Sequence, residues 1–177
     1  MELSQTQPAA RVQIKHPALA MVGLMVGSFV GMFSETALNI ALPSLMAALN
    51  VTQGTIQWLV TGYMLVIGIC MPLSSLLTKW FTTKKIVLFA LGAFIVGSVI
   101  AALGNVFGVV LFGRMIQGIG TGLVLPLMFS VALQIFPPHK IGTVMGMAAL
   151  VIMFAPAIGP TVTGLLLAKL SWHFIFW

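Results

Sequence analysis

Two ionisable side chains, Glu35 and Arg114, lie within long apolar stretches of the sequence. A charge at the centre of a bilayer costs roughly 2.5–3.5 kcal/mol on insertion scales, so such residues usually face a protein interior or a water-filled cavity. Glu35 comes eight residues before Pro43, and Arg114 comes eight residues after Val106. In helices, each would lie about 12 Å inside the same membrane boundary. We therefore expect a Glu35–Arg114 pair whose strength changes when Glu35 takes up a proton. The alternative is a structural ion pair that only fixes how the helices align.

Small and polar residues repeat on the same faces as these two charges. Asn39 follows Glu35 by one helical turn, and Gln117 lies beside Arg114. We expect both amides to line a cavity together with the charged pair. Gly118 follows Arg114 at the same four-residue spacing, and small residues let membrane helices approach closely. For Gly118 we therefore favour a role in helix packing.

The composition indicates the medium that surrounds these residues. Of the 177 residues, 60% are hydrophobic and only 6% are charged, and the carboxylate side chains are limited to Glu2 and Glu35. An average soluble domain contains about 25% charged residues. In lipid, backbone polar groups must be satisfied internally, which favours helices. The sequence therefore predicts an all-α protein that crosses the lipid bilayer several times.

Five apolar stretches are long enough to cross the hydrocarbon layer, which takes about 20 helical residues. We predict membrane helices over Ala18–Leu42, Thr55–Leu77, Ile86–Leu103, Val106–Phe136 and Ile141–Ala168, within a partial bundle of residues 18–177. A polar tail of residues 1–17 precedes this bundle, and the residues up to Trp177 are interpreted as the start of a sixth helix. The fourth stretch is longer than one crossing requires, so we expect it to tilt or to protrude.

The basic residues follow the alternation of these stretches. If successive helices alternate in direction, one side of the membrane carries Arg11, Lys15, Lys79, Lys84, Lys85 and Lys140. The other side carries only Lys169. Cytoplasmic loops have an excess of lysine and arginine. We therefore expect a multi-pass protein of the cell membrane with a cytoplasmic N-terminus.

Several classes of function lack the residues that they would need. The net charge of +6 could suggest a nucleic-acid partner, but the basic residues are scattered between long apolar stretches. His16, His139 and His173 do not have metal-ligand spacing. The sequence has no glycine-rich phosphate loop followed by Lys-Ser or Lys-Thr. We therefore expect no nucleic acid, no enzyme activity, no metal and no bound cofactor.

The fifth stretch contains two prolines, Pro156 and Pro160, and Gly159 lies between them. Proline removes a backbone donor and bends a helix. The two prolines share a helix face beside small residues, so we expect a bent helix that packs closely on a neighbour. Such a helix suits a bundle that rocks between two states.

These motifs resemble the major facilitator superfamily, and within it the 14-helix drug:proton antiporters. The fourth-helix motif of that group, R-x-x-Q-G-x-G, is similar to the run from Arg114 to Gly120. Its fifth-helix motif, G-x-x-x-G-P-x-x-G-G, resembles the run from Ala155 to Gly164, in which Ala155 and Thr163 replace two glycines. The resemblance covers about residues 18–177 and implies the N-terminal portion of a larger transporter.

Two departures from the family pattern concern charged residues. The first-helix motif usually carries Asp at the position of Ser34, whereas here the acid is Glu35, about 100° further around a helix. A branch that resembles the lincomycin-resistance multidrug exporters shares this shifted acid. The loop motif G-x-L-A-D-R-x-G-R-K keeps its basic end at Lys84 and Lys85, but Lys79 stands where its acid is expected. A gating ion pair in that loop is therefore not implied.

The resemblance implies proton-coupled export of drugs or other amphipathic organic compounds by alternating access, with coupling at Arg114 and Glu35. It also implies a conformational hinge at Gly159 and Pro160. The expected partners are the lipid bilayer, protons, small organic molecules and the remainder of a longer chain, because five helices cannot complete even one half of such a transporter. Two alternatives stay open: a truncated membrane protein that binds or regulates a partner, and an uptake transporter of the same fold.

Overall fold

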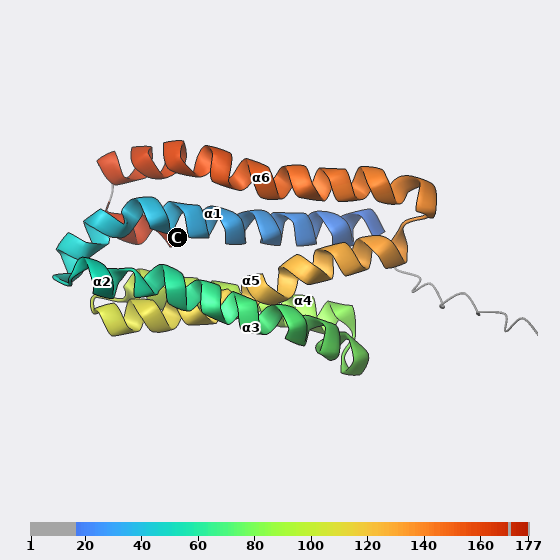
Figure 1. Cartoon of the computed structure of the whole chain (residues 1–177), viewed down its shortest axis with the longest axis horizontal. Helices are drawn as coiled ribbons and strands as arrows, with labels where there is room; N and C mark the ends of the chain where they lie inside the picture. The colour runs from blue at the N-terminus through green and yellow to red at the C-terminus, as the bar shows by residue number, and fades with distance from the viewer. Residues whose placement is uncertain (1–16, 170, 177) are drawn as a thin grey trace, which may run out of the picture.

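The structure, a computed structural model, describes residues 17–169 and 171–176. Its elements are α1 (Pro17–Leu49), α2 (Gln53–Ile56), α3 (Trp58–Trp80), α4 (Thr83–Leu103), α5 (Phe107–Ile135), α6 (Pro138–Lys169) and the 3-10 turn η1 (Trp172–Ile175). Within these two ranges every regular element is helical. Figure 1 shows the long helices lying along one common axis. The predicted all-α class is therefore confirmed.

Five helical stretches of the described chain are long and apolar enough to cross a membrane, as predicted. The second of them joins α2 and α3, because Gln57 is the only residue between these helices. The observed helix ends lie within three residues of the predicted ones, except at the end of α1. The predicted polar tail and Trp177 lie outside the described residues. Where we predicted the start of a sixth helix, the described residues form η1, which contacts α1, α4 and α6.

Helix α1 does not end at Leu42, where the sequence analysis placed its boundary. It includes Pro43 and ends at Leu49. A proline inside a helix removes one backbone hydrogen bond. Leu45, which follows the proline, is fully buried, so the apolar contacts of the extra turns favour continuation of the helix. The prediction was wrong because it read Pro43 as a helix end.

The end of α1 is set by Asn50, whose φ of 50° lies in the left-handed region. Asparagine tolerates this conformation better than most residues. The Val51 N–H donates a hydrogen bond of 3.3 Å to the Met46 carbonyl, as in a Schellman motif. The chain therefore leaves α1 through a satisfied cap and turns into α2.

The long helices alternate in direction, so their connections gather at two ends of the bundle (Figure 1). The α3–α4 and α5–α6 connections share one end, which we call the basic end because it carries Lys79, Lys84, Lys85 and Lys140. Lys169, the last residue of α6, lies at the opposite end. The described lysines are therefore distributed as the alternation of spans predicts.

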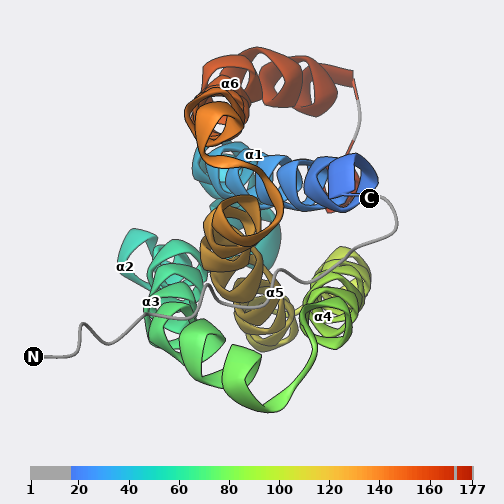
Figure 2. The ribbon, with the colours of Figure 1, turned by 90° about the vertical axis from the view of Figure 1, so that its right-hand side faces the viewer.

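Helix α5 is the most buried of the five membrane-length stretches, and it contacts α1, α3, α4 and α6. Figure 2 shows α5 between α3 and α4, with α1 and α6 above it. A Cβ atom at Gly118 would lie 3.0 Å from the Tyr63 carbonyl oxygen of α3, and one at Gly113 would lie 2.7 Å from the Ala101 nitrogen of α4. Glycines on two faces of α5 therefore let two neighbouring helices approach backbone to backbone.

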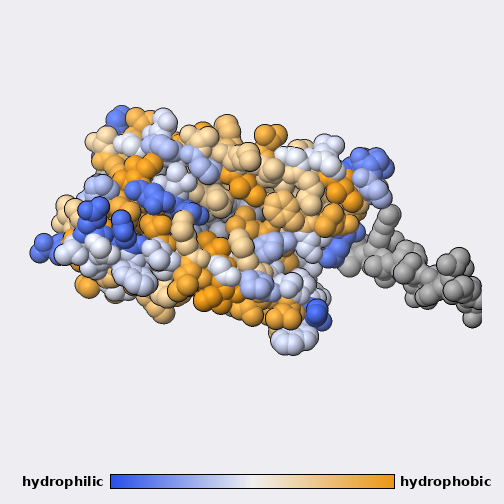
Figure 3. Space-filling view, viewed as in Figure 1, coloured by the Kyte–Doolittle hydropathy of each residue, from blue (hydrophilic) through white to orange (hydrophobic). Residues whose placement is uncertain are grey.

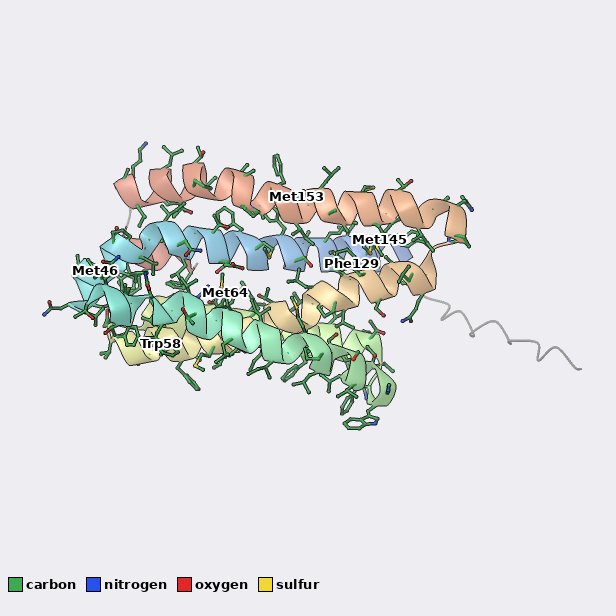
Figure 4. The ribbon with its side chains drawn as sticks, in the orientation of Figure 1. Met46, Trp58, Met64, Phe129, Met145 and Met153 are labelled. Atoms are coloured by element: carbon green, nitrogen blue, oxygen red, sulfur yellow. The ribbon has the colours of Figure 1, made fainter. Side chains whose placement is uncertain are left out.

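Two clusters of buried apolar side chains hold the bundle together, one toward each end of α5. On α5, Val110 belongs to one cluster, whereas the residues from Leu123 to Ala132 contribute to the other. Phe129 of α5 and Met145 of α6 pack against the second cluster (Figure 4). The outer surface is also largely apolar along the bundle, with hydrophilic residues gathered toward its ends (Figure 3). Such a surface suits a hydrocarbon surrounding.

Candidate functional site

Arg114 lies between the two apolar clusters, about 10 Å from the start of α5, and its side chain is 0% exposed. Its Nη1 donates hydrogen bonds of 2.9 Å to Ser34 Oγ on α1 and of 2.9 Å to Gln117 Oε1 on α5. The Tyr63 ring on α3 lies 3.9 Å from the guanidinium carbon, measured to the ring centroid. Nε and Nη2 of Arg114 are buried without a hydrogen-bond partner. The guanidinium is therefore held by neutral groups and keeps unused donors.

The predicted Glu35–Arg114 pair does not form in this structure. The Nη1 atom of Arg114 bonds to Ser34 and Gln117, and its other two nitrogens have no partner. Glu35 is half-buried on α1. Asn39 is exposed, and its Nδ2 donates a hydrogen bond of 3.1 Å to the Glu35 backbone carbonyl. The sequence analysis placed Glu35 and Arg114 at similar depths in the bundle, which agrees with the hydrogen bond between Arg114 and Ser34. It did not identify the side of α1 that faces Arg114. Ser34 faces Arg114, and Glu35 lies about 100° away from it around the helix.

The hydrogen bonds around Arg114 extend to two further helices. Gln117 Nε2 donates a hydrogen bond of 2.6 Å to Ser98 Oγ on α4. The Tyr63 hydroxyl donates a hydrogen bond of 3.2 Å to the Gly31 carbonyl on α1 and lies 2.8 Å from Thr121 Oγ1 on α5. One buried polar network therefore connects α1, α3, α4 and α5. Because buried polar groups are costly unless they are paired, this network specifies how the four helices meet.

Tyr63 joins the network by both its ring and its hydroxyl, which allows the two contributions to be separated. Substitution Tyr63→Phe keeps the ring beside Arg114 but removes the bonds to Gly31 and Thr121. We expect a loss of stability of about 1–3 kcal/mol, because a buried acceptor loses its donor. Thermal unfolding of the purified protein in detergent measures this loss. Tyr63→Leu, which also removes the ring, should destabilise further; an unchanged melting temperature in Tyr63→Phe would show that the hydroxyl contributes nothing.

A pocket of about 570 Å³ opens beside the network, between α1, α4, α6 and η1. Its polar lining comes from Ser34, Ser98 and Gln117, and the rest is apolar and aromatic. Of the four residues predicted to line a cavity, Gln117 lines this pocket, whereas Glu35, Asn39 and Arg114 do not. The pocket has the composition that suits an apolar body with a few hydrogen-bonding groups.

The other predicted residues lie in two separate places. On α6, Gly159 is buried against α1, where a Cβ atom would lie 2.9 Å from Thr36 Cγ2. Pro156 is half-buried and Pro160 is exposed, and α6 remains helical through both. Lys84 and Lys85 are exposed in the first turn of α4, at the basic end. None of these residues takes part in the hydrogen bonds around Arg114.

The sequence analysis did not identify Ser34, Tyr63, Ser98 or Thr121 as partners in the network. Ser98 carries no signal, because a single serine in an apolar stretch is ordinary in a membrane helix. Ser34 was noted only as the position where an acid is usual, yet it is the residue that Arg114 contacts. The depth of Ser34, level with Arg114, is the signal that could have identified it.

The arrangement around Arg114 can respond to a negative charge. A buried guanidinium interacts with an anion far more strongly than an exposed one does, because the surroundings have a low dielectric constant. Two of its nitrogens have hydrogens free to donate. Arg114 can therefore attract a carboxylate, and protonation of that carboxylate would weaken the attraction.

A family model described as Major Facilitator Superfamily matches residues 24–177. The lincomycin resistance protein LmrB of Bacillus subtilis is 57% identical over 157 residues, which are 89% of this chain and 33% of that protein. LmrB of Listeria monocytogenes is 48% identical over 171 residues, which are 97% of this chain and 36% of that protein. Multidrug resistance protein 3 of B. subtilis is 28% identical over 157 residues, which are 89% of this chain and 30% of that protein.

The chain thus spans about a third of the length of these curated relatives. The family match extends from within α1 to the last residue and includes the whole polar network described above. This chain belongs to the Major Facilitator Superfamily.

Proposed function

We propose that this chain is part of a proton-coupled exporter that removes drugs or other amphipathic organic compounds by alternating access. Its similarity to proteins named for lincomycin and multidrug resistance supports the export of such compounds. The observation that carries the proposal is Arg114, a charge buried at membrane depth whose partners are all neutral. Buried charges within membrane helices are costly and typically serve ion or proton pathways.

The positions of Ser34 and Glu35 support the proposed proton coupling. Arg114 bonds to Ser34, and Glu35 is the next residue on the same helix. A rotation of α1 about its axis would move the Ser34 hydroxyl away from Arg114 and bring the Glu35 carboxylate to it. An ionised Glu35 favours that exchange, because it would satisfy the free donors of Arg114, whereas a protonated Glu35 does not. Proton uptake would thereby shift the balance between two arrangements of the bundle.

The contact between α1 and α6 supports movement between such arrangements. Ala155, Gly159 and Thr163 are buried on α6 at intervals of four residues. Gly159 lies close to Thr36 of α1, so small side chains form the contact between the two helices. The hydroxyl of Thr163 is buried without a partner, so it does not tie the two helices together. We assign the hinge of alternating access to Gly159 and Pro160 on this helix.

The proposed location is the cell membrane with the basic end toward the cytoplasm. Lys79, Lys84, Lys85 and Lys140 share that end, and lysines are enriched in cytoplasmic loops. Because successive helices alternate, the start of α1 lies at the same end. The N-terminus is then cytoplasmic.

Substitution Glu35→Gln tests the coupling in the complete transporter. We expect proton-gradient-driven efflux of lincomycin to fall by about 5–150-fold, the range of a typical coupling free energy. Efflux into acid-loaded inverted membrane vesicles measures it, with the amount of protein in the membrane as a reference. Glu35→Asp keeps a carboxylate and should retain most of the pH dependence.

Two results would contradict this proposal. If Glu35→Gln kept the same dependence on the proton gradient as the unchanged protein, Glu35 would not couple the proton. If the unchanged protein accumulated lincomycin in whole cells when energised, the direction of transport would be uptake.

A further inference from the structure

A second pocket lies at the basic end, between the end of α3 and the start of α4. These two helix ends are at the lower right in Figure 1. Its volume is about 370 Å³, and it is lined by Leu77, Phe81, Lys85, Ile86 and Phe89. The Phe81 side chain is 51% exposed and the Phe89 side chain is 62% exposed. The pocket is therefore an apolar recess on the outside of the bundle, apart from the Arg114 network.

Polarity changes with depth along this pocket. Lys85 precedes Phe89 by one turn of α4, and Phe81 follows Leu77 just after the last turn of α3. Because α3 runs toward the basic end and α4 runs away from it, Lys85 and Phe81 lie about 6 Å nearer to that end than Phe89 and Leu77. Trp80, which precedes Phe81 in the sequence, is 77% exposed, and tryptophan is enriched at the membrane–water interface. The pocket thus has a cation at its mouth and apolar walls below.

The lysines at this end lack acidic partners in the described part of the chain. Glu35, near the middle of α1, is the one carboxylate side chain within residues 17–169 and 171–176. Lys79, Lys84 and Lys85 are all exposed near the α3–α4 connection. Among the described residues, no acidic side chain therefore compensates the charge at the pocket mouth.

We propose that this pocket binds an anionic glycerophospholipid from the surrounding bilayer. Its phosphate lies at Lys85, with Lys84 adjacent, and an acyl chain lies against Leu77 and Phe89. The order of charge and apolar surface matches that of a phospholipid in its leaflet, and basic pockets between membrane helices are known to suit anionic headgroups. Helices α3 and α4 pack mainly on α5 and little on each other. The lipid would bridge the ends of these two helices.

Native mass spectrometry of the purified protein in a mild detergent tests this site. Phosphatidylglycerol and phosphatidylcholine with identical acyl chains are titrated separately. We expect phosphatidylglycerol to bind more tightly, and Lys85→Gln to weaken it about fivefold while leaving phosphatidylcholine unchanged. Phe89→Ala should weaken both lipids, because it removes the apolar wall that an acyl chain contacts. Both side chains are exposed, so these variants should fold normally.

Lys140→Gln is the matched control, because Lys140 is an exposed lysine at the same end but outside the pocket. It should leave phosphatidylglycerol binding unchanged. Equal binding of the two lipids to the unchanged protein would overturn the proposal. If Lys140→Gln and Lys85→Gln weakened phosphatidylglycerol binding equally, the lipid would be attracted to the charged end as a whole and would not occupy a specific site. Displacement of phosphatidylglycerol by the same concentration of inorganic phosphate would assign the pocket to a free anion.

Discussion

Substitution Arg114→Met is expected to abolish the proposed gradient-driven efflux in the complete transporter while the protein stays folded. Arg114 is fully buried, no carboxylate of the described residues bonds to it, and two of its nitrogens have no hydrogen-bond partner there. Replacing a whole buried ion pair by apolar side chains of similar volume is often neutral or stabilises a protein by about 1–4 kcal/mol. Arg114→Met likewise leaves no buried charge behind, and the removed desolvation cost offsets the donor that Gln117 Oε1 loses. The bonds to Ser34 and Gln117 are lost, but Gln117 still donates to Ser98. We therefore expect an unchanged or higher melting temperature together with a complete loss of coupling.

Thermal unfolding in detergent and efflux from inverted vesicles, measured on the same preparation, separate the two effects. Lys79→Met is the matched control, because it removes an exposed basic residue from the end of α3. It should alter neither property. An Arg114→Met protein that unfolds would make Arg114 a structural residue. One that still showed the proposed gradient-driven export would remove Arg114 from the proposed coupling mechanism.

Substitution Gly97→Ala is expected to be strongly destabilising at the contact between α4 and α5. A Cβ atom at Gly97 would lie 2.6 Å from the Gly113 carbonyl oxygen and 2.6 Å from the Gln117 nitrogen. Both are backbone atoms, so no change of rotamer relieves the clash, and the helices must separate. Overpacking typically costs about 1–3 kcal/mol. The displacement also moves Gln117, one of the partners of Arg114, so we expect weaker efflux as well.

Gly92→Ala provides the matched control on the same helix. Nothing lies within 4 Å of a Cβ atom at Gly92. Alanine favours a helix over glycine by about 1 kcal/mol, so this change should be neutral or stabilising. If the melting temperature falls in Gly97→Ala and rises in Gly92→Ala, the close α4–α5 contact is the cause of the destabilisation. Equal shifts would mean that the two helices can separate without cost.

The boundaries of the membrane helices were largely predictable from the sequence, because the transfer of apolar residues into lipid depends on composition and length. The ends of α3, α4, α5 and α6 all came within three residues of their predicted positions. The end of α1 did not, because Pro43 was treated as a helix end when its neighbours supply enough buried contact to carry the helix past it. The separation of the described lysines between the two ends also followed from alternation alone.

The partners of Arg114 depended on the tertiary structure. The sequence identified Arg114, Gln117 and Glu35 as polar groups at similar depth, because depth follows from counting residues along a helix. Which side chain meets Arg114 depends instead on how far each helix is rotated about its own axis, and no local pattern specifies that rotation. The close approach of Gly31 on α1 to Thr121 on α5, together with the contacts of α5 glycines with α3 and α4, fits one such rotation for each helix. Those contacts direct Ser34, rather than Glu35, toward the guanidinium, and bring Tyr63 and Ser98 into the same network.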